Sequence, residues 1–139
     1  MLSRTIYLSR LIGLFMLILS IEDMMHKTAT VEIVTTVVNN PSLMFTYGIL
    51  TLLAGLATVL AHNVWTGGAA SVVVTLIGWA LLIKGAVVIF IAQSGITGLL
   101  ETTRYAEYYD VYAAIPLLLG LYLTYVGFSA HHSKRHKTS

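Results

Sequence analysis

The sequence contains no cysteine and few charged residues. Without cysteine, the protein can form no disulfide, no thiolate zinc site and no cysteine-ligated iron–sulfur cluster. Charged residues make up 10% of the 139 residues, whereas a soluble domain carries roughly 25%. So few charges cannot cover a surface that faces water. Most of the surface must therefore face an apolar medium, and the length predicts a single domain, 1–139.

Long apolar stretches are what the sequence has instead, because 57% of its residues are hydrophobic. A helix needs about 20 apolar residues to cross the hydrocarbon core of a bilayer. Transmembrane strands would alternate in polarity and would have to close into a barrel, and these stretches do not alternate. We therefore predict an all-α, integral membrane four-helix bundle. Its spans lie at about 5–25, 41–62, 69–93 and 109–129, and a basic tail follows at 130–139.

The first span is the shortest, because its uninterrupted apolar run covers only Leu11 to Ile21. A run of this length behind positive charges is also typical of a cleavable signal peptide. However, the residues that follow include Glu22 and Asp23 and offer no small-residue cleavage pattern. This favours a retained helix, with Arg10 extending its charged group toward the nearer headgroups.

Basic residues predict the orientation of the chain. Arg4 and Arg10 lie near the N-terminus, and Lys134, Arg135 and Lys137 lie in the C-terminal tail. Cytoplasmic segments are enriched in lysine and arginine, so both termini are predicted to be cytoplasmic. The acidic residues then fall on the opposite side: Glu22, Asp23, Glu32, Glu101, Glu107 and Asp110.

Three connecting segments differ in length. Residues 63–68 form a tight connection, which makes spans two and three antiparallel neighbours. The two longer segments, 28–39 and 95–109, are predicted to be short amphipathic stretches on the extracytoplasmic side. In the first of these, Val31, Val34 and Val38 share a helical face, although its β-branched residues disfavour a helix. Asn40-Pro41 is typical of a helix N-cap followed by proline at the first helical position.

Lys84 is the most informative polar residue, because it lies inside the third span. A lysine at the centre of a membrane helix costs about 3 kcal/mol and usually faces a bundle interior or water. We expect a partner from the acidic side: Glu22 or Asp23 first, and then Asp110, Tyr108 or Tyr112. Two interpretations stay open, a structural ion pair or snorkelling lysine, and a charge that lines a pathway or binds a headgroup or anion.

Small and hydroxyl residues recur at alternating three- and four-residue spacing in spans two and three. Such residues let membrane helices approach closely, and this repeat suits left-handed packing. The predicted packing stripe comprises Gly48, Thr51, Gly55, Thr58, Gly78 and Gly85. It serves either close packing within one bundle or contacts between subunits.

A polar cluster of His62, Asn63 and Trp65 ends the second span. The pattern His62-Asn63-Val64-Trp65, then Gly78-Trp79, then Lys84-Gly85 resembles an uncharacterised family of small bacterial membrane proteins. The resemblance covers mainly spans two and three and implies a four-span protein of the bacterial inner membrane, with no established activity. From the residues alone, Trp65 is an interfacial anchor, and Asn63 caps the span or turns the chain. Two interpretations stay open for the cluster: a purely structural role, or a contact of His62 with a proton or a lipid.

Three classes of function follow from this pattern. The leading hypothesis is a non-enzymatic membrane protein that acts by self-assembly or as an accessory subunit of a larger complex. The alternative is a small oligomeric ion channel or transporter with Lys84 in the pathway. An enzyme is disfavoured, because the acids and His62 are predicted on opposite faces. We expect no cofactor, no metal even at the histidines of the tail, and no nucleic acid; anionic lipids should bind the basic tail.

Overall fold

The computed structural model describes residues 3–91 and 108–135, and this part of the chain is all helical, with five helices and no strand. Four of the helices are long and apolar enough to cross a membrane. They are α1 (Ser3–Met25), α3 (Pro41–Ala61), α4 (Ala69–Ile91) and α6 (Tyr109–Arg135). The protein is thus a multi-pass membrane protein of the predicted fold class. The predicted amphipathic stretch at 95–109 lies almost wholly outside the described residues.

The fifth helix, α2 (Lys27–Asn39), joins α1 to α3 and has no buried residue. The helical alternative for this segment is therefore the one observed, despite its β-branched residues. Asn40 ends α2 and begins α3: its side-chain oxygen accepts hydrogen bonds from the backbone N–H groups of Ser42 at 3.1 Å and Leu43 at 3.2 Å, and Pro41 is the first helical residue. The N-cap predicted at Asn40-Pro41 is confirmed.

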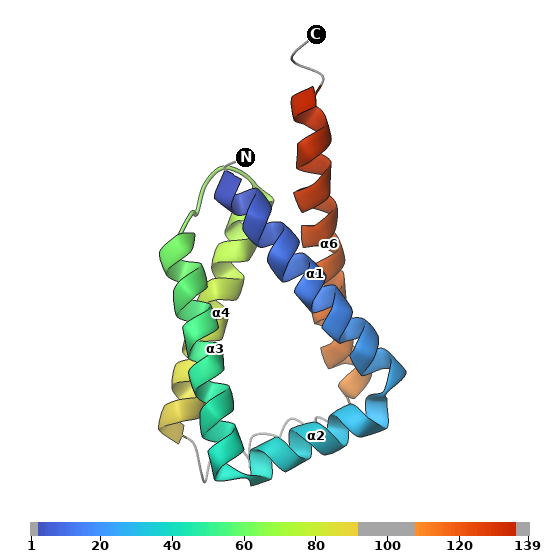
Figure 1. The fold of residues 1–139 in the computed structure, drawn as a ribbon, viewed down its shortest axis with the longest axis vertical. Coiled ribbons are helices and arrows are strands. Elements are labelled where there is room, and N and C mark those ends of the chain that lie inside the picture. The colour runs from blue at the N-terminus through green and yellow to red at the C-terminus, as the bar shows by residue number, and fades with distance from the viewer. Residues whose placement is uncertain (1–2, 92–107, 136–139) are drawn as a thin grey trace.

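The long helices form two pairs, α3 with α4 and α1 with α6 (Figure 1). Glycine permits the close approach in both pairs. A Cβ atom on Gly55 of α3 would overlap the backbone nitrogen of Leu82 of α4, and one on Gly13 of α1 would lie 2.7 Å from the backbone nitrogen of Thr124 of α6. The helix backbones therefore touch at these positions, as small residues allow in membranes.

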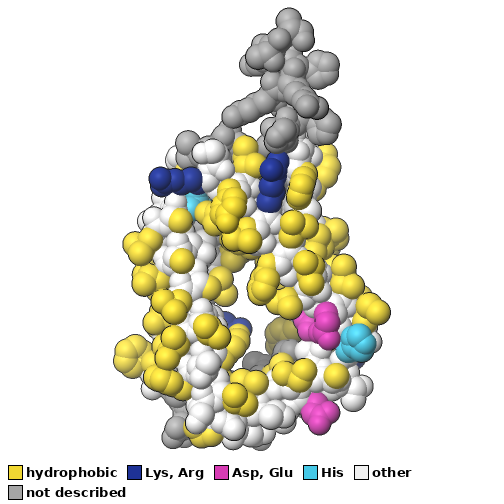
Figure 2. Space-filling model, viewed as in Figure 1, with side chains coloured by type: hydrophobic (Ala, Val, Ile, Leu, Met, Phe, Trp, Pro, Cys, Tyr) yellow, Lys and Arg dark blue, Asp and Glu magenta, His cyan; other side chains and the backbone are white. Residues whose placement is uncertain are grey.

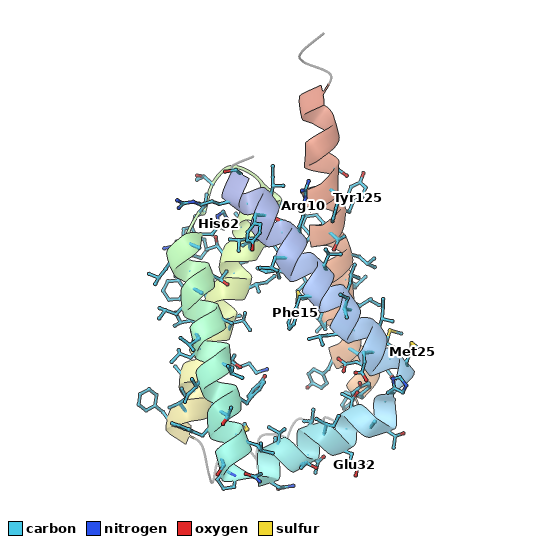
Figure 3. All side chains as sticks on the ribbon, viewed as in Figure 1. Arg10, Phe15, Met25, Glu32, His62 and Tyr125 are labelled. Atoms are coloured by element: carbon cyan, nitrogen blue, oxygen red, sulfur yellow. The ribbon has the colours of Figure 1, made fainter. Side chains whose placement is uncertain are left out.

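The two pairs meet at one end of the molecule and diverge toward the other (Figure 1). They meet around Leu8 of α1, Val74 of α4 and Leu123 of α6, which form the buried hydrophobic cluster. At the far end, α2 lies across the space between the pairs (Figure 1). We call these the His62 end and the α2 end, since Figure 3 shows His62 at the first and Glu32 of α2 at the second.

In the described residues, the acidic side chains lie toward the α2 end, and Arg4 and Arg10 lie toward the His62 end. The acids Glu22, Asp23, Glu32 and Asp110 belong to the last turn of α1, to α2 and to the start of α6, whereas Arg4 and Arg10 belong to the first half of α1. Figure 2 shows the acidic side chains near the α2 end and hydrophobic side chains over most of the surface between the ends. α6 continues to Arg135, so the helix extends beyond the span end predicted near 129 and includes part of the basic tail.

Candidate functional site

His62 lies at the end of α3 and is buried, with 2% of its surface exposed. Its Nε2 atom lies 3.3 Å from the backbone oxygen of Ser71 in α4. A carbonyl oxygen only accepts hydrogen bonds, so this contact requires the ring form that carries a proton on Nε2. The predicted second span reached residue 62, whereas α3 ends at Ala61 and His62 is its C-cap. His62 thus links the end of α3 to the start of α4 by a side-chain hydrogen bond.

Thr75, one turn after Ser71 in α4, also contacts the segment that joins α3 to α4. Its fully buried hydroxyl accepts a hydrogen bond from the N–H of Val64 at 3.1 Å and lies 3.0 Å from the carbonyl oxygens of both Val64 and Ser71. One hydroxyl therefore contacts both backbone groups of Val64, which leave the helical pattern in the connection. Its single proton is shared between the carbonyl oxygens of Val64 and Ser71. Gly67 and Gly68 close the connection with φ angles of 94° and 121°, which glycine adopts without strain.

Asn63 holds the two indole rings of this region. Its side-chain oxygen accepts hydrogen bonds from Trp65 Nε1 at 2.9 Å and from Trp79 Nε1 at 3.4 Å. The C-cap of α3 is His62, and the Asn63 amide instead links the connecting segment to Trp79, one helical turn beyond Thr75 in α4. Trp65 is 55% exposed, which suits the interfacial role predicted for it.

The same region contacts the other helix pair. The hydroxyls of Thr5 in α1 and Ser71 in α4 lie 3.5 Å apart, and both residues are buried. The cluster predicted as His62, Asn63 and Trp65 therefore extends to Thr5, Ser71, Thr75 and Trp79. Ser71 and Thr75 belong to the small and hydroxyl residues of the third span, and the sequence gave no signal for a contact with Thr5.

Within the described part of the chain, Lys84 pairs with none of the acids predicted as its partner. Lys84 is exposed and forms no ion pair there; its ammonium lies 5.4 Å from the centre of the Tyr47 ring of α3. The neighbouring residue explains the exposure. Gly85 faces α3 so closely that a Cβ atom would overlap Leu52, and successive residues differ by about 100° around a helix. Lys84 therefore cannot share the buried face of Gly85.

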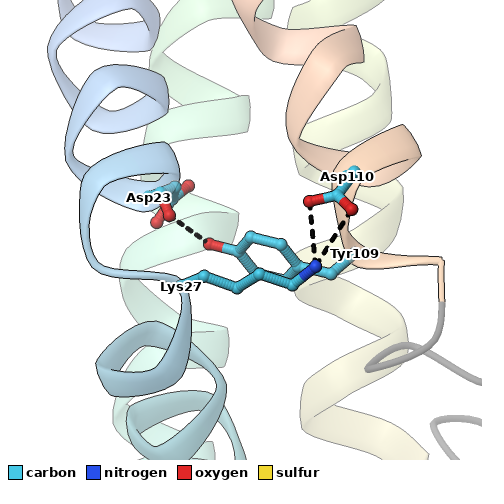
Figure 4. A network of polar contacts seen from close by, with 4 residues as sticks. All are labelled: Asp23, Lys27, Tyr109 and Asp110. Carbon is cyan, nitrogen blue, oxygen red and sulfur yellow. Dashed lines mark hydrogen bonds and ion pairs between the residues drawn. The ribbon is translucent and has the colours of Figure 1, made fainter.

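At the α2 end, the expected acid Asp110 pairs with Lys27, and Asp23 takes part through its backbone (Figure 4). Both carboxylate oxygens of Asp110 accept hydrogen bonds from Lys27 Nζ, at 2.9 and 3.0 Å. The backbone oxygen of Asp23 accepts one from the Tyr109 hydroxyl at 2.8 Å, and the Lys27 ammonium lies 5.3 Å from the Tyr109 ring. Glu22 lies 3.5 Å from His26, one turn along the chain. Lys27 directly precedes the segment 28–39, which is predicted on the same side of the membrane as Asp110, so the order of the chain is consistent with this pairing.

The predicted packing stripe lies between α3 and α4. Gly48 faces Val88 and Ile89, and Gly78 faces Thr58 and Val59. All six members are buried: Gly48, Thr51, Gly55, Thr58, Gly78 and Gly85. Within one molecule, the stripe therefore serves packing of the hairpin, and its buried face is not available to a second copy.

Arg10 has a role in the α1–α6 pair that the sequence did not indicate. Its Nε donates a hydrogen bond to the backbone oxygen of Gly127 at 2.9 Å, and its guanidinium lies 4.8 Å from the centre of the Phe128 ring. Figure 3 shows Arg10 between α1 and α6. The residue expected only to extend toward headgroups thus also joins the two helices.

The described residues contain no group of three or more His, Asp or Glu side chains able to hold a metal ion. The tail residues His136 and Lys137 lie outside them. In the comparisons with known proteins, no protein-family model, no curated protein and no solved structure matches the chain. The resemblance carried by residues 62–65, 78–79 and 84–85 therefore gains no support from them.

Proposed function

We propose that this protein is a non-enzymatic integral membrane protein that acts by assembly, either with itself or as an accessory subunit of a larger complex. The observation that carries the proposal is how little of each span is buried: only 22 to 28% of the apolar stretch of each span lies inside the molecule. The described connections are short helices and turns. A partner must therefore contact mainly the membrane-embedded surface.

The distribution of ionisable groups supports a role other than catalysis. Acid–base catalysis requires its groups within hydrogen-bonding reach of one substrate. His62 follows the last residue of α3, whereas the acids gather at the opposite end. The 21 residues of α3 separate these ends by about 32 Å.

The proposed location is a bacterial inner membrane with both termini in the cytoplasm. Arg4 and Arg10 at the His62 end support this orientation by the positive-inside rule, and Lys134 and Arg135 end α6. Each basic residue near an anionic membrane surface contributes about 1 kcal/mol of attraction. Anionic lipids are therefore the proposed partners of the basic tail.

Crosslinking tests the assembly, and the absence of cysteine makes it simple. Leu60 and Phe90 are 77% and 87% exposed, whereas Val74 is fully buried. Leu60→Cys and Phe90→Cys variants, treated in native membranes with a thiol crosslinker, should give a defined higher-mass species at one of the two positions. The matched Val74→Cys variant should give none.

Native mass spectrometry of the full chain in mild detergent complements the crosslinking. A defined oligomer or a stoichiometric partner is the expected result. A monomer without a co-purifying protein, together with no crosslinked species at either exposed position, would overturn the proposal.

The channel or transporter alternative is favoured by one observation, the exposed Lys84 inside a membrane span. Two helix pairs that meet at one end enclose no pore by themselves, so several copies would have to surround the pathway. Ion flux into liposomes that contain wild type or Lys84→Ala distinguishes the two functions. Flux that depends on Lys84 would replace the assembly proposal, and no flux in either protein removes the alternative.

A further inference from the structure

An opening lies between the two helix pairs and persists when all side chains are drawn (Figure 2). At the His62 end it is closed by Leu8, Val74 and Leu123. At the α2 end the pairs are separated by α2, whose 13 residues span about 20 Å. The space is therefore a wedge that narrows from the α2 end to the His62 end.

The position of Lys84 on α4 directs it toward this wedge. Val73 and Ile77 pack against the cluster that joins the pairs. Lys84 follows them by 11 and 7 residues, which places it within about 20° of both on the helix surface. Lys84 therefore lies on the same face of α4 that contacts the other pair. It is closer to the α2 end, where the two pairs are farther apart.

The matching face of α1 is apolar. Leu8 and Ile12 belong to the joining cluster, and Phe15 follows Leu8 by two turns on the same face. Phe15 is 61% exposed, and Figure 3 shows it on the side of α1 that borders the opening. The wedge thus has an apolar wall on α1 and a cation on α4.

The Lys84 ammonium extends toward the wide end of the wedge. Gly85 lies against Leu52, whereas Gly48 lies against Val88 and Ile89. Tyr47 is therefore level with residues of α4 that are closer to the α2 end than Lys84 is. Because the ammonium lies 5.4 Å from the centre of the Tyr47 ring, the lysine side chain reaches along the helix toward the α2 surface.

This ammonium has no carboxylate partner among the described residues, where Asp110 pairs with Lys27 and Glu22 lies beside His26. An anion at the wide end of the wedge would complete its coordination. A transmembrane helix of a partner is a poor occupant, because a helix is a cylinder about 10 Å wide along its whole length and the wedge closes. Flexible acyl chains fill a tapering apolar space.

We propose that the wedge binds one phospholipid, whose phosphate contacts Lys84 and whose acyl chains lie between the pairs against Phe15. The lipid would enter from the surrounding bilayer with its headgroup toward the α2 end. This site is distinct from the basic tail and needs no second copy of the chain. It holds whether the protein is a monomer or part of an assembly.

Native mass spectrometry with added lipid tests this site in the full-length protein. The lipids are phosphatidylglycerol, phosphatidylcholine and diacylglycerol, each at the same concentration. Both phosphate-containing lipids should give a one-lipid adduct, and diacylglycerol should not. Lys84→Met should weaken that adduct at least about tenfold, the loss expected for a hydrogen bond to a charged group, and Lys84→Arg should retain it.

Arg4→Met is the matched control, because Arg4 is an exposed cation at the His62 end and its loss should leave the adduct unchanged. Circular dichroism spectra identical to wild type establish that each variant is folded. Equal adducts in wild type and Lys84→Met would overturn the site, as would equal binding of diacylglycerol or displacement of the lipid by millimolar inorganic phosphate. Crosslinking of a Phe15→Cys variant to another protein chain would show that a helix, and not a lipid, occupies the wedge.

Discussion

The two helix pairs solve the same packing problem with different polar chemistry. In the α3–α4 pair, adjacent helices are joined by a short connection, and the buried Thr75 hydroxyl contacts the backbone N–H and carbonyl oxygen of Val64 in it. In the α1–α6 pair, the helices come from opposite ends of the sequence. There the hydroxyls of Ser9, Ser20 and Thr124 are buried, and no hydrogen-bond partner is present among the described residues.

This difference shows that close packing and the hydrogen bonding of buried polar groups contribute separately to the stability of a helix pair. Both pairs bring helix backbones together at glycine, so dispersion contacts act in both. The α3–α4 pair gains in addition from the hydrogen bonds of the buried Thr75 hydroxyl at its end. The α1–α6 pair is instead joined by the hydrogen bond from Arg10 to Gly127 within the span and by that from Tyr109 to Asp23 at its end.

The largest expected effect comes from filling the closest glycine contact. Gly55→Leu places a side chain into the backbone of Leu82, and overpacking of this kind costs about 3 kcal/mol or more. We expect the thermal unfolding midpoint in detergent to fall steeply and the α3–α4 pair to separate. Ala57→Leu, at an exposed position of the same helix, should leave the midpoint unchanged. Equal effects of the two variants would mean that the backbones do not touch at Gly55.

The next effect concerns the network that distinguishes the α3–α4 pair. Thr75→Val keeps the shape of the side chain but leaves the backbone groups of Val64 without their partner, which costs roughly 1–3 kcal/mol. Hydrogen exchange of the Val64 amide should accelerate, and the unfolding midpoint should fall. Unchanged exchange at Val64 would show that the hydroxyl does not protect it.

The α1–α6 pair should respond in the opposite direction to loss of a hydroxyl. Ser9→Ala removes a buried group that has no partner among the described residues, so we expect no loss of stability and a gain of up to about 1 kcal/mol. Ser20→Ala should behave alike. The measurement is the unfolding midpoint, compared with that of Thr75→Val. A clear loss of stability in Ser9→Ala would indicate a hydrogen bond at that hydroxyl and would remove the contrast between the pairs.

The smallest effect is expected at the α2 end. Asp110→Asn weakens the contact with Lys27. The side chains of Asp110 and Lys27 are 81% and 45% exposed, and exposed ion pairs contribute about 0–1 kcal/mol to stability. The difference in unfolding midpoint from wild type should be small and should shrink further in high salt. A loss that persists at high salt would mean that Asp110 has a second, buried role.

The sequence predicted well the features that depend on local composition. Four apolar runs determine four helices, because backbone polar groups in lipid must pair within the segment. Asn40-Pro41 marks the start of α3 from its own chemistry, and the spacing of Gly48 and Gly55 marks the face that packs. The network of Thr5, Ser71 and Thr75 was not predictable, since it depends on which helices meet.

Lys84 shows the same limit most clearly. The sequence established that a lysine lies within an apolar span and therefore needs a polar environment. It could not decide between a buried acid and an exposed position, because that depends on the angle between helix pairs. In the tertiary structure, Gly85 packs against Leu52 and Lys84 lies on the face of α4 that borders the wedge. Asp110 forms its ion pair with Lys27 instead. Composition alone thus determined the four spans, whereas the divergence of the pairs decided which polar groups meet, since contacts between distant segments follow from packing geometry.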